Sequence, residues 1–64
     1  MIIWKEDTIH NTIEGWVNGK LRFDIEPDEG EFNLYDLEKP IFNIQTFSSL
    51  EKAQDYCNNL FKKP

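Results

Sequence analysis

The C-terminal part of the chain, residues 47–63, most constrains the fold because it predicts a single amphipathic helix. Ser48 and Glu51 have the S-x-x-E spacing of a capping box. The apolar residues that follow recur at helical spacing on one face: Leu50, Ala53, Cys57, Leu60 and Phe61. A helix of about fourteen residues spans about 21 Å. Ordering each of its residues costs roughly 1–2 kcal/mol, so the rest of the chain must supply a surface for it to pack on.

The size and residue usage of the chain predict one small domain. A chain of 64 residues has room for a single core. Its single cysteine, Cys57, excludes an internal disulfide framework and a zinc site built from cysteine pairs. The longest apolar run, Met1–Trp4, is too short for a signal peptide or a membrane span. With Met1 as a natural start, we expect a complete, cytoplasmic protein.

Two turn signals predict an antiparallel sheet before the helix. Asn18-Gly19 lies between two β-like runs and is typical of a hairpin. In Glu26–Gly30, Pro27 suits the first central position of a four-residue loop and Gly30 supplies a positive φ. The first hairpin has two candidate registers.

A two-residue turn would pair Trp16 with Leu21 and place Glu14 opposite Phe23 in the core, unless a bulge at Gly15 corrects the phase. A three-residue loop matches opposite charges across the strands, so we favour it. Its pairs are Trp16 with Lys20, Glu14 with Arg22 and Ile13 with Phe23. Extended across the second loop, this register pairs Ile25 with Phe32 and Phe23 with Leu34.

The sequence therefore predicts an α+β fold, a three- to four-stranded antiparallel meander with one C-terminal helix packed on one face. The face beneath the helix would carry Ile13, Leu21, Phe23, Ile25, Phe32 and Leu34. The opposite face would carry Thr12, Glu14, Trp16, Lys20, Arg22, Asp24, Asn33, Tyr35 and Leu37. Ile41–Phe47, after Pro40, is either a short fourth strand or an extended lead into the helix. Met1–Trp4 either pairs at an edge or folds over the sheet.

The net charge of −5 is unevenly distributed along the chain. Seven acids and no lysine or arginine lie between Asp24 and Glu38. This segment argues against binding to nucleic-acid phosphates and favours a partner with a basic surface. Its candidate contact residues are Asp28, Glu29 and Glu31. The alternative is a solvated acidic turn that keeps the protein soluble.

The residues that could carry chemistry do not form a recognisable site. Cys57 is on the apolar helix face and His10 lies among turn residues, so we assign both to structure. Asp24, Glu26 and Asp28 alternate as in a calcium loop, but the rest of that motif is missing. Glu14 and Asp24 lie on an open face, without the cleft that shifts catalytic pKa values. We expect no catalytic residue, metal site or cofactor, and therefore a non-enzymatic protein.

The predicted outer face of the sheet is the second candidate site. Trp16, Tyr35 and Leu37 would cluster there with Lys20 and Arg22. Exposed aromatic residues with charges around them are typical of contact surfaces. In the alternative, Met1–Trp4 or Ile41–Phe47 covers these side chains and makes a small second core.

Two segments, Gly19–Ile25 and Phe47–Ala53, carry a resemblance to small phage, prophage or bacterial proteins. In that group an early tryptophan and a turn glycine precede two or three strands and a Phe-x-Ser-Leu-Glu-x-Ala helix start. The resemblance implies a mobile-element accessory or inhibitor protein that binds a host protein. One alternative is binding of single-stranded nucleic acid, with bases stacked on Trp16 and Tyr35 and phosphates attracted by Lys20 and Arg22. The other is homo-oligomerisation, as a dimer for example, through an edge strand.

Overall fold

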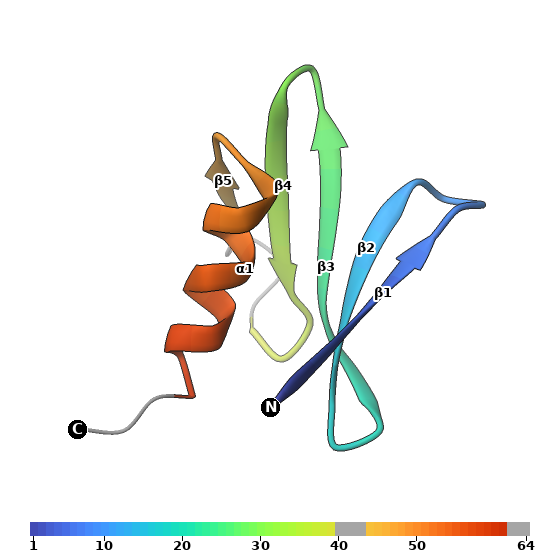
Figure 1. Cartoon of the computed structure of the whole chain (residues 1–64), viewed down its shortest axis with the longest axis vertical. Coiled ribbons are helices and arrows are strands. Elements are labelled where there is room, and N and C mark those ends of the chain that lie inside the picture. The colour runs from blue at the N-terminus through green and yellow to red at the C-terminus, as the bar shows by residue number, and fades with distance from the viewer. Residues whose placement is uncertain (40–43, 62–64) are drawn as a thin grey trace.

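The computed structural model of the protein describes residues 1–39 and 44–61. Five antiparallel strands form one meander sheet in the order β1-β2-β3-β4-β5, followed by helix α1 (Figure 1). The elements are β1 Ile2–Asp7, β2 Thr12–Val17, β3 Lys20–Asp28, β4 Glu31–Asp36, β5 Ile44–Phe47 and α1 Leu50–Asn59. The α+β class and the meander are as predicted.

The sheet has five strands rather than the predicted three to four, because both doubtful segments join its edges. β1 continues through the charged residues to Asp7 and pairs along its whole length with β2. Its even-numbered residues Ile2 and Trp4 pack against the core. β5 pairs with β4 from Ile44 to Phe47, while positions 41–43 of the predicted segment lie outside the described residues, as does Pro40.

The favoured register of the first hairpin was wrong. Asn18 and Gly19 both have positive φ, 53° and 80°, as a two-residue type I′ turn requires. The pairing then shifts between Gly15 and Trp16, so that Arg22 is the extra residue of a bulge in β3. The observed pairs are Trp16 with Leu21, Gly15 with Phe23, Glu14 with Asp24 and Ile13 with Ile25. The bulge restores the phase, so Phe23 and Ile25 reach the core without the longer loop.

The second hairpin also has a two-residue turn in place of the predicted four-residue loop. Glu29 and Gly30, with φ of 49° and 83°, connect Asp28 to Glu31. Pro27 is therefore a strand residue, paired with Phe32. The turn makes Asp28 and Glu31 the hydrogen-bonded pair, so the next pair is a non-hydrogen-bonded one and proline's missing N–H does not weaken this ladder. The pairs deeper in the hairpin are Ile25 with Leu34 and Phe23 with Asp36.

Helix α1 begins one residue later than the predicted capping box. Ser49 is the N-cap, and its Oγ accepts a hydrogen bond of 3.1 Å from the Lys52 N–H. The helix is ten residues long rather than about fourteen. Backbone bonds from Leu60 to Cys57 and from Phe61 to Asn58 tighten its end into a 3₁₀-like turn, and residues 62–63 lie outside the described part.

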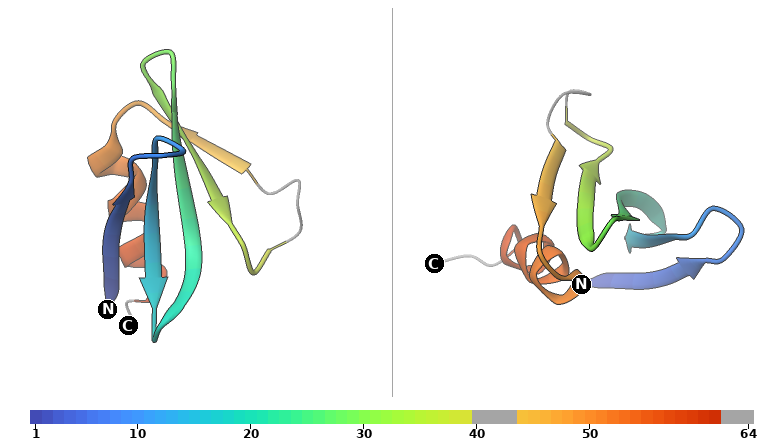
Figure 2. Two further views of the ribbon diagram at one scale, coloured as in Figure 1. Left: turned by 90° about the vertical axis from the view of Figure 1, so that its right-hand side faces the viewer. Right: turned by 90° about the horizontal axis from the view of Figure 1, so that it is seen from above.

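The core lies between α1 and the face of the sheet that α1 covers (Figure 2). Its buried members are Ile2, Phe23, Ile25, Leu34, Ala53 and Cys57. Trp4, Ile13, Val17, Phe32, Phe47, Leu50 and Tyr56 pack around them. The predicted helix-facing set is thus confirmed except for Leu21, which pairs with Trp16 on the other side of the bulge. Leu60 and Phe61, which the sequence placed on the helix, follow its last residue and remain partly exposed.

Candidate functional site

The face of the sheet opposite α1 is the candidate functional site. Helix α1 contacts β3, β4 and β5 from one side only, and within residues 1–39 and 44–61 no helix or further strand covers the other side. We call this side the uncovered face. Because paired residues of neighbouring strands share a side, the register defines its composition. One row across the strands is Ile3, Trp16 and Leu21, and the next is Lys5, Glu14, Asp24, Tyr35 and Ile44.

The uncovered face is acidic. Alternation along the strands brings carboxylates from four strands to it: Asp7, Glu14, Asp24, Glu26, Asp28 and Glu31. Glu14 and Asp24 are directly opposite each other, an arrangement of like charges that destabilises a sheet. Among the described strand residues, Lys5 is the one base that the register places on this face.

Asp24 is the least satisfied of these acids. Its Oδ1 atom is buried and has no hydrogen-bond partner within the described part of the chain. Burial raises the pKa of the Asp24 carboxyl above its ordinary value of 3.8, a hydrogen bond with Thr12 opposes the rise, and the charges of Glu14 and Glu26 add to it. An acceptor atom that is buried without a donor, among like charges, makes the ionised form of Asp24 costly, and a nearby cation would reduce that cost.

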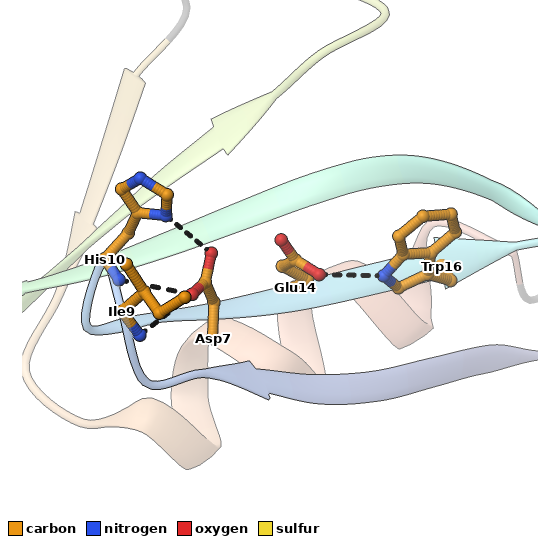
Figure 3. A network of polar contacts seen from close by, with 5 residues as sticks. All are labelled: Asp7, Ile9, His10, Glu14 and Trp16. Carbon is orange, nitrogen blue, oxygen red and sulfur yellow. Dashed lines mark hydrogen bonds and ion pairs between the residues drawn. The ribbon is translucent and has the colours of Figure 1, made fainter.

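Trp16 and Glu14 hold each other in place on β2. The Trp16 Nε1–H donates a hydrogen bond of 3.1 Å to Glu14 Oε1, and Figure 3 shows the two side chains in succession along the strand. The Lys5 Nζ atom of β1 lies 4.9 Å from the Trp16 ring centroid. Lys5 also pairs with Glu14 across the strands. The ammonium group of Lys5 thus lies over the Trp16 ring, on the strand position opposite Glu14.

The β1–β2 turn closes one end of this face. The Asp7 carboxylate accepts bonds from the Ile9 and His10 backbone N–H groups at 3.0 and 3.2 Å, and its Oδ2 lies 2.9 Å from His10 Nδ1 (Figure 3). The side-chain hydrogen bond between the two lowers the pKa of Asp7 and raises the pKa of His10. The coulombic effect of Asp24 and Glu14 also favours protonated His10.

Tyr35 is on the same face but apart from Trp16. Its hydroxyl donates a bond of 3.3 Å to Glu26 Oε1. Burial raises the pKa of Tyr35, and the charge of Glu26 adds to the rise. Trp16 pairs with Leu21 and Tyr35 with Asp24, so the Glu14–Asp24 pair separates the two rings. Trp16 and Tyr35 therefore do not form the predicted cluster, and each ring instead lies beside carboxylates of the uncovered face.

The predicted basic partners of these aromatic residues are elsewhere. Arg22 lies at the bulge on the helix side, where its Nε and Nη2 donate bonds of 3.1 Å to the Asp36 carboxylate. Its guanidinium carbon is 4.9 Å from the Phe23 ring centroid and 5.2 Å from that of Phe61. Lys20 pairs with Val17, which packs on the core. Because the bulge changes the alternation of β3, neither base joins Trp16.

The remaining predicted contact residues are exposed. Leu37 lies just beyond β4, where its N–H bonds to the Arg22 carbonyl, and 53% of it is exposed. Asp28, Glu29 and Glu31 surround the β3–β4 turn, which projects beyond the other turns in Figure 1. Asp28 and Glu31 continue the acids of the uncovered face to this tip. Lys5 and Glu14 were not predicted as contact residues. Asp24 and Glu26 belong to the acidic segment that was predicted to attract a basic partner, but they were not among its named contact residues.

Other places in the fold offer less for binding. Burial raises the pKa of the Cys57 thiol to about 12, so this thiol stays protonated at neutral pH. A hollow of about 100 Å³ between α1 and the β4–β5 pair is lined by Leu34, Asp36, Lys39, Gln45, Tyr56 and Leu60. Within the described ranges, no cluster of His, Cys, Asp or Glu is arranged to hold a metal ion, and no helix has the length and apolar character needed to cross a membrane.

No protein-family model, curated protein or solved structure matches this chain.

Proposed function

We propose that the protein is a non-enzymatic binding module whose uncovered face docks a basic segment of a partner protein. The observation that carries the proposal is the row of strand carboxylates on this face, in which Glu14 lies directly opposite Asp24. Opposed like charges cost stability, and neither the core nor the helix contacts require them. A lysine or arginine from a partner would offset the repulsion between these carboxylates.

The described residues offer a surface for contact more readily than a small-molecule pocket. Ligand pockets usually enclose about 300–1,000 Å³, and the hollow beside α1 is about 100 Å³. The uncovered face instead offers an open strip, with Trp16 near one end and the exposed β3–β4 tip at the other. We call this strip, with its carboxylates Glu14, Asp24, Glu26 and Asp28, the docking strip. Such a mixture of aromatic and charged groups is typical of protein interfaces.

Binding of single-stranded nucleic acid is the less supported alternative. Trp16 and Tyr35 could stack on bases, but Glu14, Asp24 and Glu26 lie beside these rings. Arg22, the base predicted to attract the phosphates, donates a hydrogen bond to Asp36 on the helix side instead. We therefore expect a single-stranded oligonucleotide to leave Trp16 fluorescence unchanged at low salt.

The resemblance of Gly19–Ile25 and Phe47–Ala53 to small phage and bacterial proteins extends the proposal. We place the module among accessory or inhibitor proteins of phages or mobile elements, acting on a host protein in the cytoplasm. Dimerisation through the edge strands β1 or β5 is a separate alternative, which light scattering of the purified protein would detect.

A synthetic lysine-rich peptide tests the proposal. Asp24→Asn, Glu26→Gln and Asp28→Asn combined should weaken its binding about tenfold or more, because each removes a carboxylate from the docking strip. The matched control combines Glu6→Gln, Glu51→Gln and Asp55→Asn, which change the net charge equally at exposed sites away from that strip. Affinity is measured by titration calorimetry, and NMR shifts should locate the peptide on β2–β4. Equal weakening by both triple variants, or shifts confined to α1, would refute the proposal.

A further inference from the structure

The ring of Trp16, which is hydrogen-bonded to the Glu14 carboxylate, already lies beneath an ammonium group from the same chain. Lys5 Nζ lies over the Trp16 ring, and Lys5 is opposite Glu14 in the register. Aromatic rings attract cations through the negative charge of their faces, and an adjacent carboxylate adds to the attraction. The chemical class that this pair accepts is therefore visible in the free protein.

We propose that Lys5 is an internal competitor, which occupies the Trp16–Glu14 pair until a lysine or arginine of the partner replaces it. This inference rests on the proposed function and identifies one position within the docking strip. The partner's segment would carry a cation over Trp16 and further cations along Glu26 and Asp28.

The relative position of Trp16 and Glu14 does not depend on Lys5, whereas the Lys5 side chain can move away from the Trp16 ring. Trp16 and Glu14 both belong to β2, which is paired on both sides, and the indole N–H fixes their relative position. Lys5 belongs to the edge strand β1, and its side chain is exposed. Removing the ammonium group would leave the ring and the carboxylate in place.

A partner's cation has an advantage that Lys5 lacks. Asp24 lies on β3, on the far side of β2 from Lys5 and directly opposite Glu14. A group that approaches from above the face can contact Glu14 and Asp24 together. Lys5 approaches from β1, and its ordinary pairing is with Glu14 alone. Exchange of the two cations therefore gains an additional acceptor.

The test compares Lys5→Met with Lys20→Met. Both variants remove one positive charge and retain a long apolar side chain, but Lys20 pairs with Val17 on the helix side. Loss of a competing exposed cation–π contact should tighten binding of the lysine-rich peptide about two- to fivefold in Lys5→Met. Lys20→Met should change it less than about twofold, because distant exposed charges are screened.

A second measurement follows Lys5 directly in the unmodified protein. Its ε-CH₂ protons should be shifted upfield by the Trp16 ring and should return to ordinary values as the peptide is added. Equal affinity gains in the two variants, or an upfield shift that persists at saturation, would overturn the exchange while peptide binding itself still supports the docking strip. Absence of peptide binding in every variant would overturn both.

Discussion

At the scale of single residues, Gly15 controls the packing of the first hairpin. It pairs with Trp4 on β1 and Phe23 on β3. A Cβ atom at this position would lie 2.7 Å from Trp4 Cζ3 and 3.2 Å from Ile2 Cγ2. The Trp4 ring is stacked on Phe23 with centroids 6.4 Å apart. A glycine is therefore required at position 15, because a larger residue would occupy the space of the Trp4 ring.

We expect Gly15→Ala to reduce the free energy of unfolding by about 1–3 kcal/mol, the usual range for overpacking a core. The cost should fall substantially in a Trp4→Leu background, because the ring that meets the new methyl group is then absent. Urea unfolding followed by far-UV circular dichroism gives both values of the double-mutant cycle. An equal cost in the two backgrounds would mean that the Trp4 ring is not the obstacle.

The residues around Gly15 also show where prediction from sequence ended. The correct two-residue turn and a bulge at Gly15 were both considered, but charge matching between Glu14 and Arg22 favoured the other register. That criterion failed because an exposed cross-strand ion pair contributes little. The two-residue turn preference of Asn18-Gly19 outweighs it, and together with the bulge it places Glu14 opposite Asp24.

At the scale of elements, Arg22 connects the bulge of β3 to the end of β4 and to the residues after α1. Its side chain is 17% exposed and that of Asp36 is 9% exposed. Burial disfavours the ionised form of Asp36, but hydrogen bonds from Arg22 and from the Glu38 N–H outweigh this and lower its pKa below 3.8. The same pair raises the pKa of Arg22. The third contact, from Arg22 to the exposed Glu38 at 3.6 Å, is weaker because water screens it.

The lowered pKa of Asp36 fixes the sign of a pH effect. A depressed carboxyl pKa contributes stability above the unfolded value of 3.8, and this contribution is lost as the pH falls through the lower folded value. Arg22→Met should therefore cost about 1–3 kcal/mol at neutral pH, and less once acid has protonated Asp36. Urea unfolding of the unmodified protein and of Arg22→Met at several pH values measures the difference between their free energies of unfolding. Asp24 and Asp7 are present in both proteins, so their effects cancel in this difference.

Lys52→Met is the control for this loss of one charge. The Lys52 Nζ atom bonds only to the Ser48 hydroxyl, at 3.2 Å, among the described contacts. We expect a change below about 0.5 kcal/mol, independent of pH, as for most surface substitutions. If Arg22→Met cost the same at acid and neutral pH, the pair with Asp36 would not be the source of its stability.

Elements with a strong local signal were predicted, and those that depend on a neighbour were not. Asn18-Gly19 and the spacing of Ala53 and Cys57 identified the first hairpin and the helix. β1 ends in charged residues, and only its pairing with β2 makes it a strand. The position of Arg22 could not be inferred either, because one bulge moves its side chain from one face of the sheet to the other.

At the scale of the whole molecule, the fold places the buried core on one side of the sheet and most of the strand carboxylates on the other. The helix side contains the core together with the Arg22–Asp36 pair. The uncovered face carries six strand carboxylates against Lys5. The acidic composition was visible in the sequence, but its assembly on one face follows from the five-stranded register. Charge repulsion on that face should oppose folding and favour a basic partner at the same time.

Salt should therefore act on the free protein and on its complex with opposite signs. Between about 0.02 and 0.3 M NaCl, screening should raise the free energy of unfolding by several tenths of a kcal/mol and weaken binding of a lysine-rich peptide. Asp24→Asn removes the acid that faces Glu14 and Tyr35, so it should reduce both responses. Glu51→Gln, exposed on α1, should reduce neither. Urea unfolding and calorimetric titration across the salt series measure the two slopes. A self-repelling acidic surface is stabilised by the same salt ions that weaken its binding to a basic partner. If the salt dependence of unfolding and of binding were the same in Asp24→Asn and Glu51→Gln, the acids of the uncovered face would not act together.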